Sequence, residues 1–199
     1  MIRTILHLSD THGLHLQLGT LPNADVLVHS GDFTTDGTEK EVFDFTEWFC
    51  RQPHPYKIFI AGNHDTCLYQ NRLEGLPDNV HYLYNSPVEI EHVKFYGLPL
   101  FAPDMATGQY DKNIREIPYD IDVLITHQPP LGIRDYAENI HCGNLNLLQQ
   151  VTTIKPRFHI FGHTHRAYGI ENIDQTFYIN SALIDDSHEL TKKPQLLSF

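Results

Sequence analysis

Short apolar runs alternate with polar turns along most of the chain. The runs are rich in valine, isoleucine, leucine and phenylalanine, and several are apolar at almost every position. Short apolar runs bounded by turn-forming residues predict β-strands, and continuous apolarity is typical of strands covered on both faces. The strands predicted in this way cover residues 2–8, 26–29, 57–60, 93–97, 123–126, 158–161 and 176–179.

Apolar residues recur at helical spacing in fewer segments. Thr38 and Glu41 have the spacing of a capping box, in which each side chain bonds the main-chain N–H of the other residue at the start of a helix. Val42 and Phe45 follow at an interval of three, so an amphipathic helix with a core-facing stripe is expected over residues 39–51. Further helices are predicted over residues 66–73, 111–117 and 144–153.

The connections between the predicted strands are of two kinds. The runs around residues 88–90 and 93–97 are separated by two polar residues, and so are the runs at 168–173 and 176–179, which predicts two hairpins. The other strands are joined by longer or helical segments, which predicts crossovers. We therefore expect an α/β fold, a four-layer αββα sandwich in which helices flank two mixed β-sheets. A length of 199 residues suits a single domain over 1–199.

Charge and composition narrow the function classes. The 25 acidic residues outnumber the 14 basic ones, and a formal net charge of -11 argues against a stable nucleic-acid partner. No apolar run approaches the ~20 residues that span a bilayer, and residues 1–10 read as a strand rather than a signal peptide. The three cysteines form no CxxC pair, which is typical of reduced thiols. We expect a cytoplasmic protein with no membrane partner.

Side chains that can bind metals follow five of the predicted strands. Ligand sites in α/β sheets lie at the carboxyl ends of the strands, so these groups are expected to meet in one place. Imidazole nitrogen and carboxylate oxygen suit manganese, iron, zinc, cobalt or nickel rather than copper(I) or an iron–sulfur cluster. The candidate ligands are Asp10, His12, Asp32, Asn63, His127, His163 and His165.

Each of these motifs is common when it stands alone. A single Asp-x-His or Gly-Asp is usually an ordinary loop or turn, and it is the recurrence after five strands that indicates a site. Gly31, Gly62 and Gly162 precede ligands, and glycine permits the tight turns and close backbone approach that such crowding needs. The remaining histidines lie within strands or polar loops and are assigned no role. They are His7, His15, His29, His54, His81, His92, His141, His159 and His188.

The ordered motifs D-x-H, G-D, G-N-H-D, T-H and G-H-x-H resemble the calcineurin-like metallophosphoesterase superfamily, over most of the chain. The segments SDTHG, HSGDFT, IAGNHD, THQPPLGIRD, FGHTHRAYG and YINSA resemble its metallophosphoesterase-domain-containing (UPF0046-type) group, which is associated with hydrolysis of phosphodiesters and cyclic nucleotides. That group has an acidic residue after the last metal histidine. Here Arg166 takes its place, which leaves the contacts to substrate open.

The resemblance implies a role for each motif. Two divalent metal ions are expected, manganese foremost, and a hydroxide that bridges them would attack the phosphorus of a small diester. His64 would face the substrate as leaving-group acid or transition-state stabiliser, and Asp65 would orient it. By this resemblance one metal is held by Asp10, His12, Asp32 and His165, and the other by Asp32, Asn63, His127 and His163.

Alternatives to a diesterase stay open at this point. A phosphomonoesterase or protein phosphatase shares the superfamily, although GDFTTDG replaces the Asp-Arg-Gly expected after the second motif. A nuclease, or an enzyme that opens 2′,3′-cyclic phosphates at RNA ends, is the second alternative, and a metal-free scaffold is the third. A crude charge count leans toward diesters, because two dications offset by Asp10 and Asp32 leave about +2. The residues that either contact substrate or are structural are Arg134, Tyr136, Arg166 and Asn180.

Overall fold

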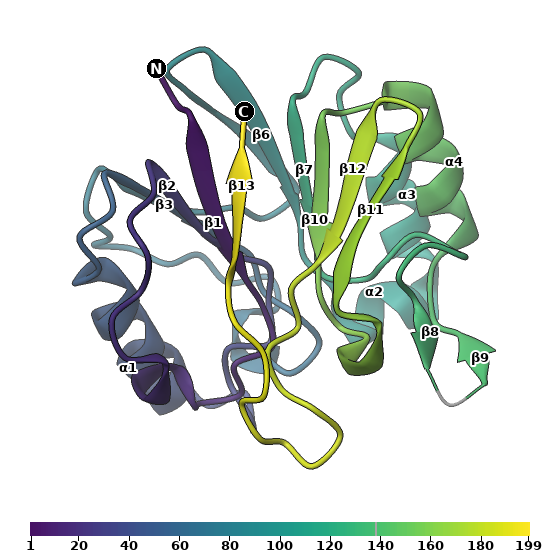
Figure 1. The fold of residues 1–199 in the computed structure, drawn as a ribbon. Helices are drawn as coiled ribbons and strands as arrows, with labels where there is room; N and C mark the ends of the chain where they lie inside the picture. Colours follow the sequence, from purple (N-terminus) through teal and green to yellow (C-terminus); the bar gives the residue numbers. More distant parts are fainter. Residues whose placement is uncertain (138) are drawn as a thin grey trace.

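Two mixed β-sheets pack face to face in the computed structural model, which describes residues 1–137 and 139–199 (Figure 1). In the first sheet, β1 to β4 run parallel to one another, and β13 lies antiparallel to β1 at the edge. Its strands, in order across the sheet, are β13 (Gln195–Ser198), β1 (Thr4–Leu8), β2 (Val26–His29), β3 (Tyr56–Phe59) and β4 (Val80–Tyr82).

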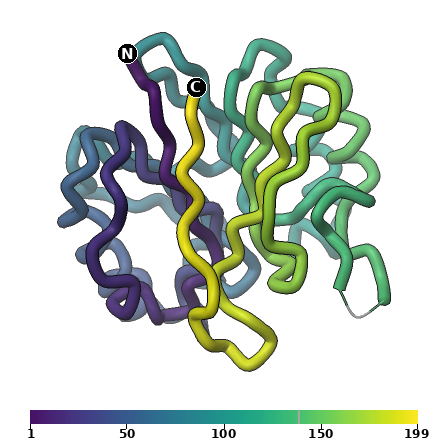
Figure 2. Tube along the Cα trace, viewed as in Figure 1, coloured from purple at the N-terminus to yellow at the C-terminus, as the bar shows by residue number. Residues whose placement is uncertain are grey.

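The second sheet has four parallel strands between two antiparallel edge strands. Its order is β11 (Gly169–Ile173), β12 (Thr176–Asn180), β10 (Phe158–Phe161), β7 (Val123–Thr126), β6 (Val93–Leu98) and β5 (Ser86–Ile90). A two-stranded ribbon of β8 (Tyr136–Ala137) and β9 (Ile140–His141) stands apart from both sheets. Both chain ends lie side by side at one end of the sandwich (Figure 2), where Thr4 pairs with Ser198.

Helices cover both outer faces. On the first sheet lies α1 (Glu39–Cys50), which begins with the predicted capping box of Thr38 and Glu41. On the second lie α3 (Gln109–Arg115) and α4 (Leu145–Ile154), with α2 (Ala102–Thr107) before them (Figure 1). Single 3₁₀ turns are η1 (His15–Leu18), η2 (Thr66–Leu68) and η3 (His165–Ala167). Within the described ranges, no helix has the length and apolarity needed to cross a membrane.

Strand alternation divides the apolar residues into three cores. Val28 and Ile58 of the first sheet meet Val123 and Ile160 of the second between the sheets. Their neighbours along each strand face outward, where one core forms under α1 and another under α3 and α4. Because every central strand is covered on both faces, its sequence is apolar almost throughout. The predicted αββα sandwich is confirmed.

Local predictions were mostly right and in one segment wrong. Both hairpins form, and Glu91 and His92 turn the first with φ angles of 46° and 68°, as a two-residue hairpin loop requires. The helix predicted over 66–73 is wrong beyond Leu68, because Tyr69 is extended and Gln70 takes a φ of 57°. Pattern reasoning also missed β4, β13 and α2, whose apolar positions are too few to define a period.

Candidate metal centre

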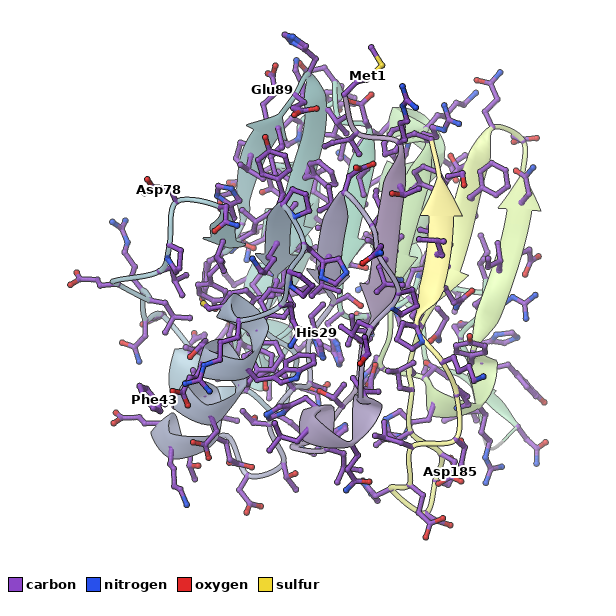
Figure 3. The ribbon with its side chains drawn as sticks, turned by 60° about the vertical axis from the view of Figure 1, so that its left-hand side comes forward. Met1, His29, Phe43, Asp78, Glu89 and Asp185 are labelled. Atoms are coloured by element: carbon purple, nitrogen blue, oxygen red, sulfur yellow. The ribbon has the colours of Figure 1, made fainter. Side chains whose placement is uncertain are left out.

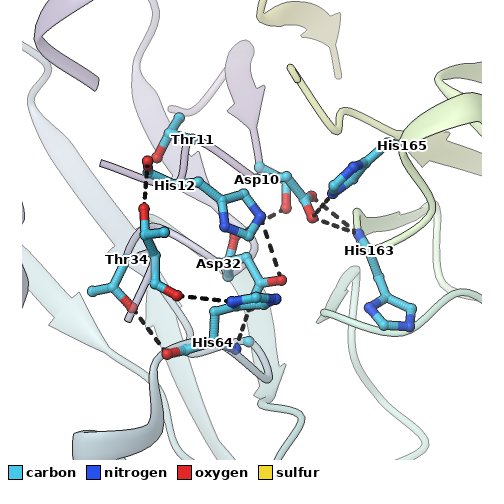
Figure 4. A network of polar contacts seen from close by, with 12 residues as sticks. Asp10, Thr11, His12, Asp32, Thr34, His64, His163 and His165 are labelled. Atoms are coloured by element: carbon cyan, nitrogen blue, oxygen red, sulfur yellow. Dashed lines mark hydrogen bonds and ion pairs between the residues drawn. The ribbon is translucent and has the colours of Figure 1, made fainter. Parts of the chain in front are cut away.

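All seven candidate ligands follow the carboxyl ends of strands, and Figure 4 shows five of them together: Asp10, His12, Asp32, His163 and His165. Asp10 and His12 follow β1, Asp32 follows β2, Asn63 follows β3, and the other three follow β7 and β10. The sandwich fold places these ends together because the central strands within each sheet are parallel. Two triads offer ligand atoms within 4.8 Å of one another: Asp10, His12 and His165, and Asp32, His127 and His163.

Asp32 belongs to the second triad, and it also approaches the first. Its Oδ1 accepts a hydrogen bond from the main-chain N–H of His64 at 2.8 Å. Its Oδ2 lies 3.7 Å from Nε2 of His12, in one triad, and 3.1 Å from Nε2 of His127, in the other. One carboxylate oxygen therefore faces both groups of ligands, while the main chain occupies the other oxygen.

Several of these polar atoms are buried without a hydrogen-bond partner among the described residues. They include Nδ1 and Nε2 of His12 and Oδ1 of Asn63. His127 Nδ1 lies 2.9 Å from the carbonyl oxygen of Ser30, which can only accept, so Nδ1 carries a proton and Nε2 offers a lone pair when the ring is neutral. Each such unpaired polar group costs about 1–3 kcal/mol. Cations bound among these atoms would remove that cost, so the residues present fit bound metal ions.

Glycine is required where two of these loops touch the carboxylates. A Cβ atom on Gly62 would come within 2.2 Å of Asp32 Oδ1, and one on Gly162 within 2.1 Å of Asp10 Oδ2. Both distances are far inside van der Waals contact. The predicted reason for glycine before the ligands, close backbone approach, is therefore confirmed at these positions.

The backbone at the ligands is strained in a way that the sequence did not reveal. Asp10, His12, Asp32 and His163 have φ angles of 54°, 39°, 56° and 66°. The left-handed region costs an L-residue about 1–2 kcal/mol, and strain of this kind clusters at functional sites. Main-chain bonds hold the strained residues: His12 N–H donates to Asp32 O at 3.1 Å, and His163 N–H to both Asp10 carboxylate oxygens at 3.0 and 3.1 Å.

The electrostatics favour a negative charge on Asp10 and Asp32, because the pKa of each carboxyl lies below its ordinary value. Burial opposes ionisation of Asp10, yet the hydrogen bond from His165 and the nearby histidine rings hold its pKa below the ordinary value. Burial likewise opposes a charge on His127, but the adjacent Asp32 raises the pKa of that imidazole to about 9. The pocket therefore concentrates negative charge that calls for cationic partners, whether protons or metal ions.

Asp65 holds main chain rather than the His64 ring. Its Oδ2 accepts from the N–H groups of Asp32 and Gly62 at 2.9 and 2.8 Å. Its Oδ1 accepts from the N–H and the hydroxyl of Thr34 at 2.9 and 2.7 Å. Burial and the charge of Asp32 raise the pKa of Asp65 to about 7. The expectation that Asp65 orients His64 directly is corrected: this carboxylate ties the loop after β2 to the loop after β3.

His64 is oriented by a carbonyl group instead. Its Nδ1 lies 2.9 Å from the carbonyl oxygen of Thr35, so Nδ1–H donates and Nε2 stays available. The ring is half-buried and stands edge-on to His12, with centroids 4.6 Å apart (Figure 4). A ring nitrogen of His64 lies within 4.8 Å of ligand atoms of His12 and Asp32. The side chain is therefore held beside the candidate ligands with one nitrogen uncommitted.

The four residues left open by the sequence have distinct positions. Asn180 is buried and structural: its amide donates to Arg134 O, Gly162 O and Thr164 O, which supports the loop that carries His163. Arg134 donates to Ile170 O at 2.8 Å and approaches Glu171 at 3.5 Å. Tyr136 is exposed and packs on His141. Arg166 forms an ion pair with Asp186, in a loop that the sequence did not connect with the site.

Buried histidines behind the site support its loops. His7 lies between the hydroxyls of Ser30 and Ser181, at 2.8 and 2.7 Å, and burial lowers its pKa to about 3. His29 accepts from Gly31 N–H at 3.2 Å, which leaves its other nitrogen to donate to Thr11. These two are structural, as the sequence suggested. His188, also assigned no role, instead lies beside His12 and His165.

Comparisons with known proteins agree with this geometry. The sequence profile described as calcineurin-like phosphoesterase matches residues 3–167. A UPF0046 protein of Caenorhabditis elegans is 34% identical over 96% of this chain and 73% of its own length. Human metallophosphoesterase domain-containing protein 1 is 31% identical over 94% of this chain and 68% of its own length. The predicted resemblance to this group is therefore confirmed.

Solved structures share the fold at low sequence identity. A Thermus thermophilus protein superposes with a TM-score of 0.65 at 13% identity, over 92% of each chain. A protein described as a novel archaeal phosphodiesterase superposes with a TM-score of 0.51 at 16% identity, over 98% of this chain and 99% of its own. These similarities show the fold, and the profile match together with both sequence relatives establishes that the chain belongs to the calcineurin-like phosphoesterase family.

Proposed function

We propose that this protein is a phosphodiesterase that uses two divalent metal ions to hydrolyse a small phosphodiester, such as a cyclic nucleotide. The observation that carries the proposal is the double set of nitrogen and oxygen ligands on either side of Asp32 Oδ2. A shared carboxylate oxygen between two triads suits two ions held close together. The proposed ligands are Asp10, His12 and His165 for one ion, Asn63, His127 and His163 for the other, and Asp32 for both.

Manganese is the metal we place first, and iron, zinc, cobalt and nickel suit the same donor atoms. Such ions polarise a phosphoryl oxygen and make water a nucleophile near neutral pH. The chain itself supplies orientation. Strained main chain and the Asp65 hydrogen bonds fix the ligand loops before any ligand arrives. Preorganisation of this kind lowers the cost of reaching the transition state.

His64 is proposed to act on the leaving group. The Thr35 carbonyl fixes the ring and leaves Nε2 uncommitted beside the candidate ligands. Protonated Nε2 can give its proton to the departing alkoxide oxygen, which is a poor leaving group without one. Neutral Nε2 has no proton to give, because Nδ1–H is committed to Thr35. Loss of this donor is the main functional consequence expected of a His64 substitution.

The basic side chains near the site favour a diester over a monoester. Arg166 is paired with Asp186, and Arg134 with Glu171 and the Ile170 carbonyl. Lys192 donates to the carbonyl oxygens of His165 and Ile184. Among the described residues at this rim, these cations are already committed, whereas clamping a dianionic monoester calls for free arginines. A diester carries a single negative charge and needs no such clamp.

A kinetic panel with defined metals tests the proposal. Metal-free protein is loaded with two equivalents of Mn²⁺ and assayed on a bis-aryl phosphodiester, 2′,3′- and 3′,5′-cyclic nucleotides, an aryl monoester and a phosphopeptide. Turnover is expected on diesters in preference to monoesters. Asp32→Ala is expected to bind fewer than two ions by elemental analysis and to lose activity, while exposed Asp44→Asn matches the wild type. Preference for the phosphopeptide, or two ions retained in Asp32→Ala, contradicts the proposal.

A further inference from the structure

A short loop over residues 184–190 lies at the metal-centre end of the sandwich. Asp185, which belongs to this loop, is at the opposite end of the molecule from Met1 and Glu89 (Figure 3). The segment leaves β12 and passes the end of β1, where Leu183 N–H donates to Ser9 O at 3.0 Å. Ser9 directly precedes the candidate ligand Asp10, so this loop begins against the metal centre.

The loop is held in one conformation by its own hydrogen bonds. Ile184 and Leu190 form an antiparallel bridge across its base. Asp185 Oδ1 accepts from the N–H groups of Ser187 and Glu189 at 2.8 and 3.2 Å. The Asp185 carbonyl accepts from His188 N–H at 3.0 Å. A loop with these bonds presents its tip in a defined position.

Two contacts join this loop to the turn that carries His165. Arg166 pairs with Asp186, with both side chains about half exposed. Lys192 donates to the His165 and Ile184 carbonyl oxygens and so joins the two segments directly. The residue that departs from the usual acidic pattern of the group therefore has a partner within the loop.

These contacts place His188 beside the metal centre. Its ring is exposed and stands almost perpendicular to two candidate ligand rings, with centroids 5.7 Å from His12 and 6.2 Å from His165. Its imidazole forms no hydrogen bond within residues 1–137 and 139–199. Its backbone has a φ angle of 59°, in the left-handed region that favours glycine. An exposed polar ring beside the metal centre, on a braced loop, is available to a ligand.

We propose that His188 contacts the phosphoryl group of the bound substrate, and that the Arg166–Asp186 pair positions it to do so. The inference rests on the proposed function, because it assigns a second substrate contact to the same site. An imidazole always carries at least one N–H, which suits an oxygen of a monoanionic diester without adding a full charge. His64 and His188 would then contact the substrate from separate loops, both packed against His12.

The test compares variants of the Mn²⁺-loaded protein by calorimetric titration with inorganic phosphate and by diester kinetics. His188→Ala is expected to weaken phosphate binding and raise KM by about 10- to 150-fold, the range for one hydrogen bond to a charged group, with a smaller effect on kcat. Arg166→Gln is expected to give about 2- to 5-fold, because a half-exposed ion pair is weak. Adding it to His188→Ala should cause no further loss, since both changes remove one contact.

Controls separate this inference from the proposed function. Ser187→Ala in the same loop and the exposed His92→Ala at the distant hairpin are expected to match the wild type. Unchanged phosphate affinity and KM in His188→Ala, in an active wild type, overturn the inference alone. Loss of metal from His188→Ala also overturns it, because the residue then serves the ions. A wild type inactive on every diester removes the proposed function, while phosphate titration still reports whether His188 contacts the anion.

Discussion

Replacing Asp65 by asparagine is expected to destabilise the protein and weaken its metal centre together. The carboxylate accepts four hydrogen bonds, from the main chain of Asp32, Gly62 and Thr34 and from the Thr34 hydroxyl. Asparagine has the same shape but only one acceptor oxygen. The amide nitrogen that replaces the second oxygen must face a buried N–H donor, which leaves at least one main-chain group unpaired.

The size of the effect follows from these contacts. If the amide oxygen takes the place of Oδ2, the Thr34 N–H is left without an acceptor. If the amide oxygen takes the place of Oδ1, the N–H groups of Asp32 and Gly62 are both left without an acceptor. One buried unpaired N–H costs about 1–3 kcal/mol, and the remaining bonds lose their charged acceptor, so a total of about 2–4 kcal/mol is expected. For a chain of this length, that lowers the melting temperature by about 5–15 °C.

The assay measures thermal unfolding of the metal-free protein, bound metal after loading, and diester turnover. Asp65→Asn is expected to lower all three, because the loops that carry Asp32 and Asn63 lose their shared anchor. Asp44→Asn, on the exposed face of α1, is the matched control and should leave all three unchanged. An unchanged melting temperature and metal content, with turnover reduced as in a His64 variant, would refute the reasoning. It would restore the role in which Asp65 only orients His64.

Three further predictions concern metals, acid and His64. Chelation is expected to lower the melting temperature and Mn²⁺ to restore it, because an ion at 100 times its Kd adds about 2.7 kcal/mol per site to the free energy of unfolding. A melting temperature that neither treatment changes argues against resident metals. Burial lowers the pKa of His159 from 6.5 to about 3, so the unfolded state binds an extra proton and stability is lost as pH falls below 6.5. Between pH 7 and 5, the free energy of unfolding measured in urea should fall by about 2 kcal/mol less in His159→Gln than in the wild type. Equal decreases in the two proteins contradict the lowered pKa of His159. His64→Ala is expected to keep two metal ions by elemental analysis and to lower diester turnover by about 10²–10⁴-fold; full activity on a poor leaving group removes His64 from the mechanism.

The positions of the ligands could be predicted because strand ends are readable. The apolar runs that end at Leu8, His29 and Phe161 differ sharply from the polar residues after them. Since central strands of such a fold are parallel within each sheet, their carboxyl ends meet whatever the details of the connections. Periodicity and composition were therefore enough to bring the ligand motifs into one place, although they could not say which atom faces which.

The supporting contacts could not be predicted, because they depend on the path of the main chain through loops. Asp65 bonds the N–H groups of Asp32 and Thr34, and no sequence pattern indicates an N–H that lies more than thirty residues away. His188 looked like one polar loop residue among others. Its relevance follows from the Arg166–Asp186 pair and from the bridge between Ile184 and Leu190, which form only in the folded chain.

Backbone strain links the positions of the ligands to the contacts that support them. Asp10, Asp32 and His163 need left-handed φ angles to aim their side chains between the sheets, and glycine, which adopts such angles freely, has no ligand atom. The chain therefore uses ligand residues where glycine would be easier, and it places glycine at the neighbouring positions 62 and 162, where a Cβ would strike the carboxylates. Such an arrangement persists only if the surroundings over-determine it. The four bonds of Asp65 and the two that His163 N–H makes to Asp10 do this from within the polypeptide, so the centre is shaped by the fold before any cation adds its own stabilisation.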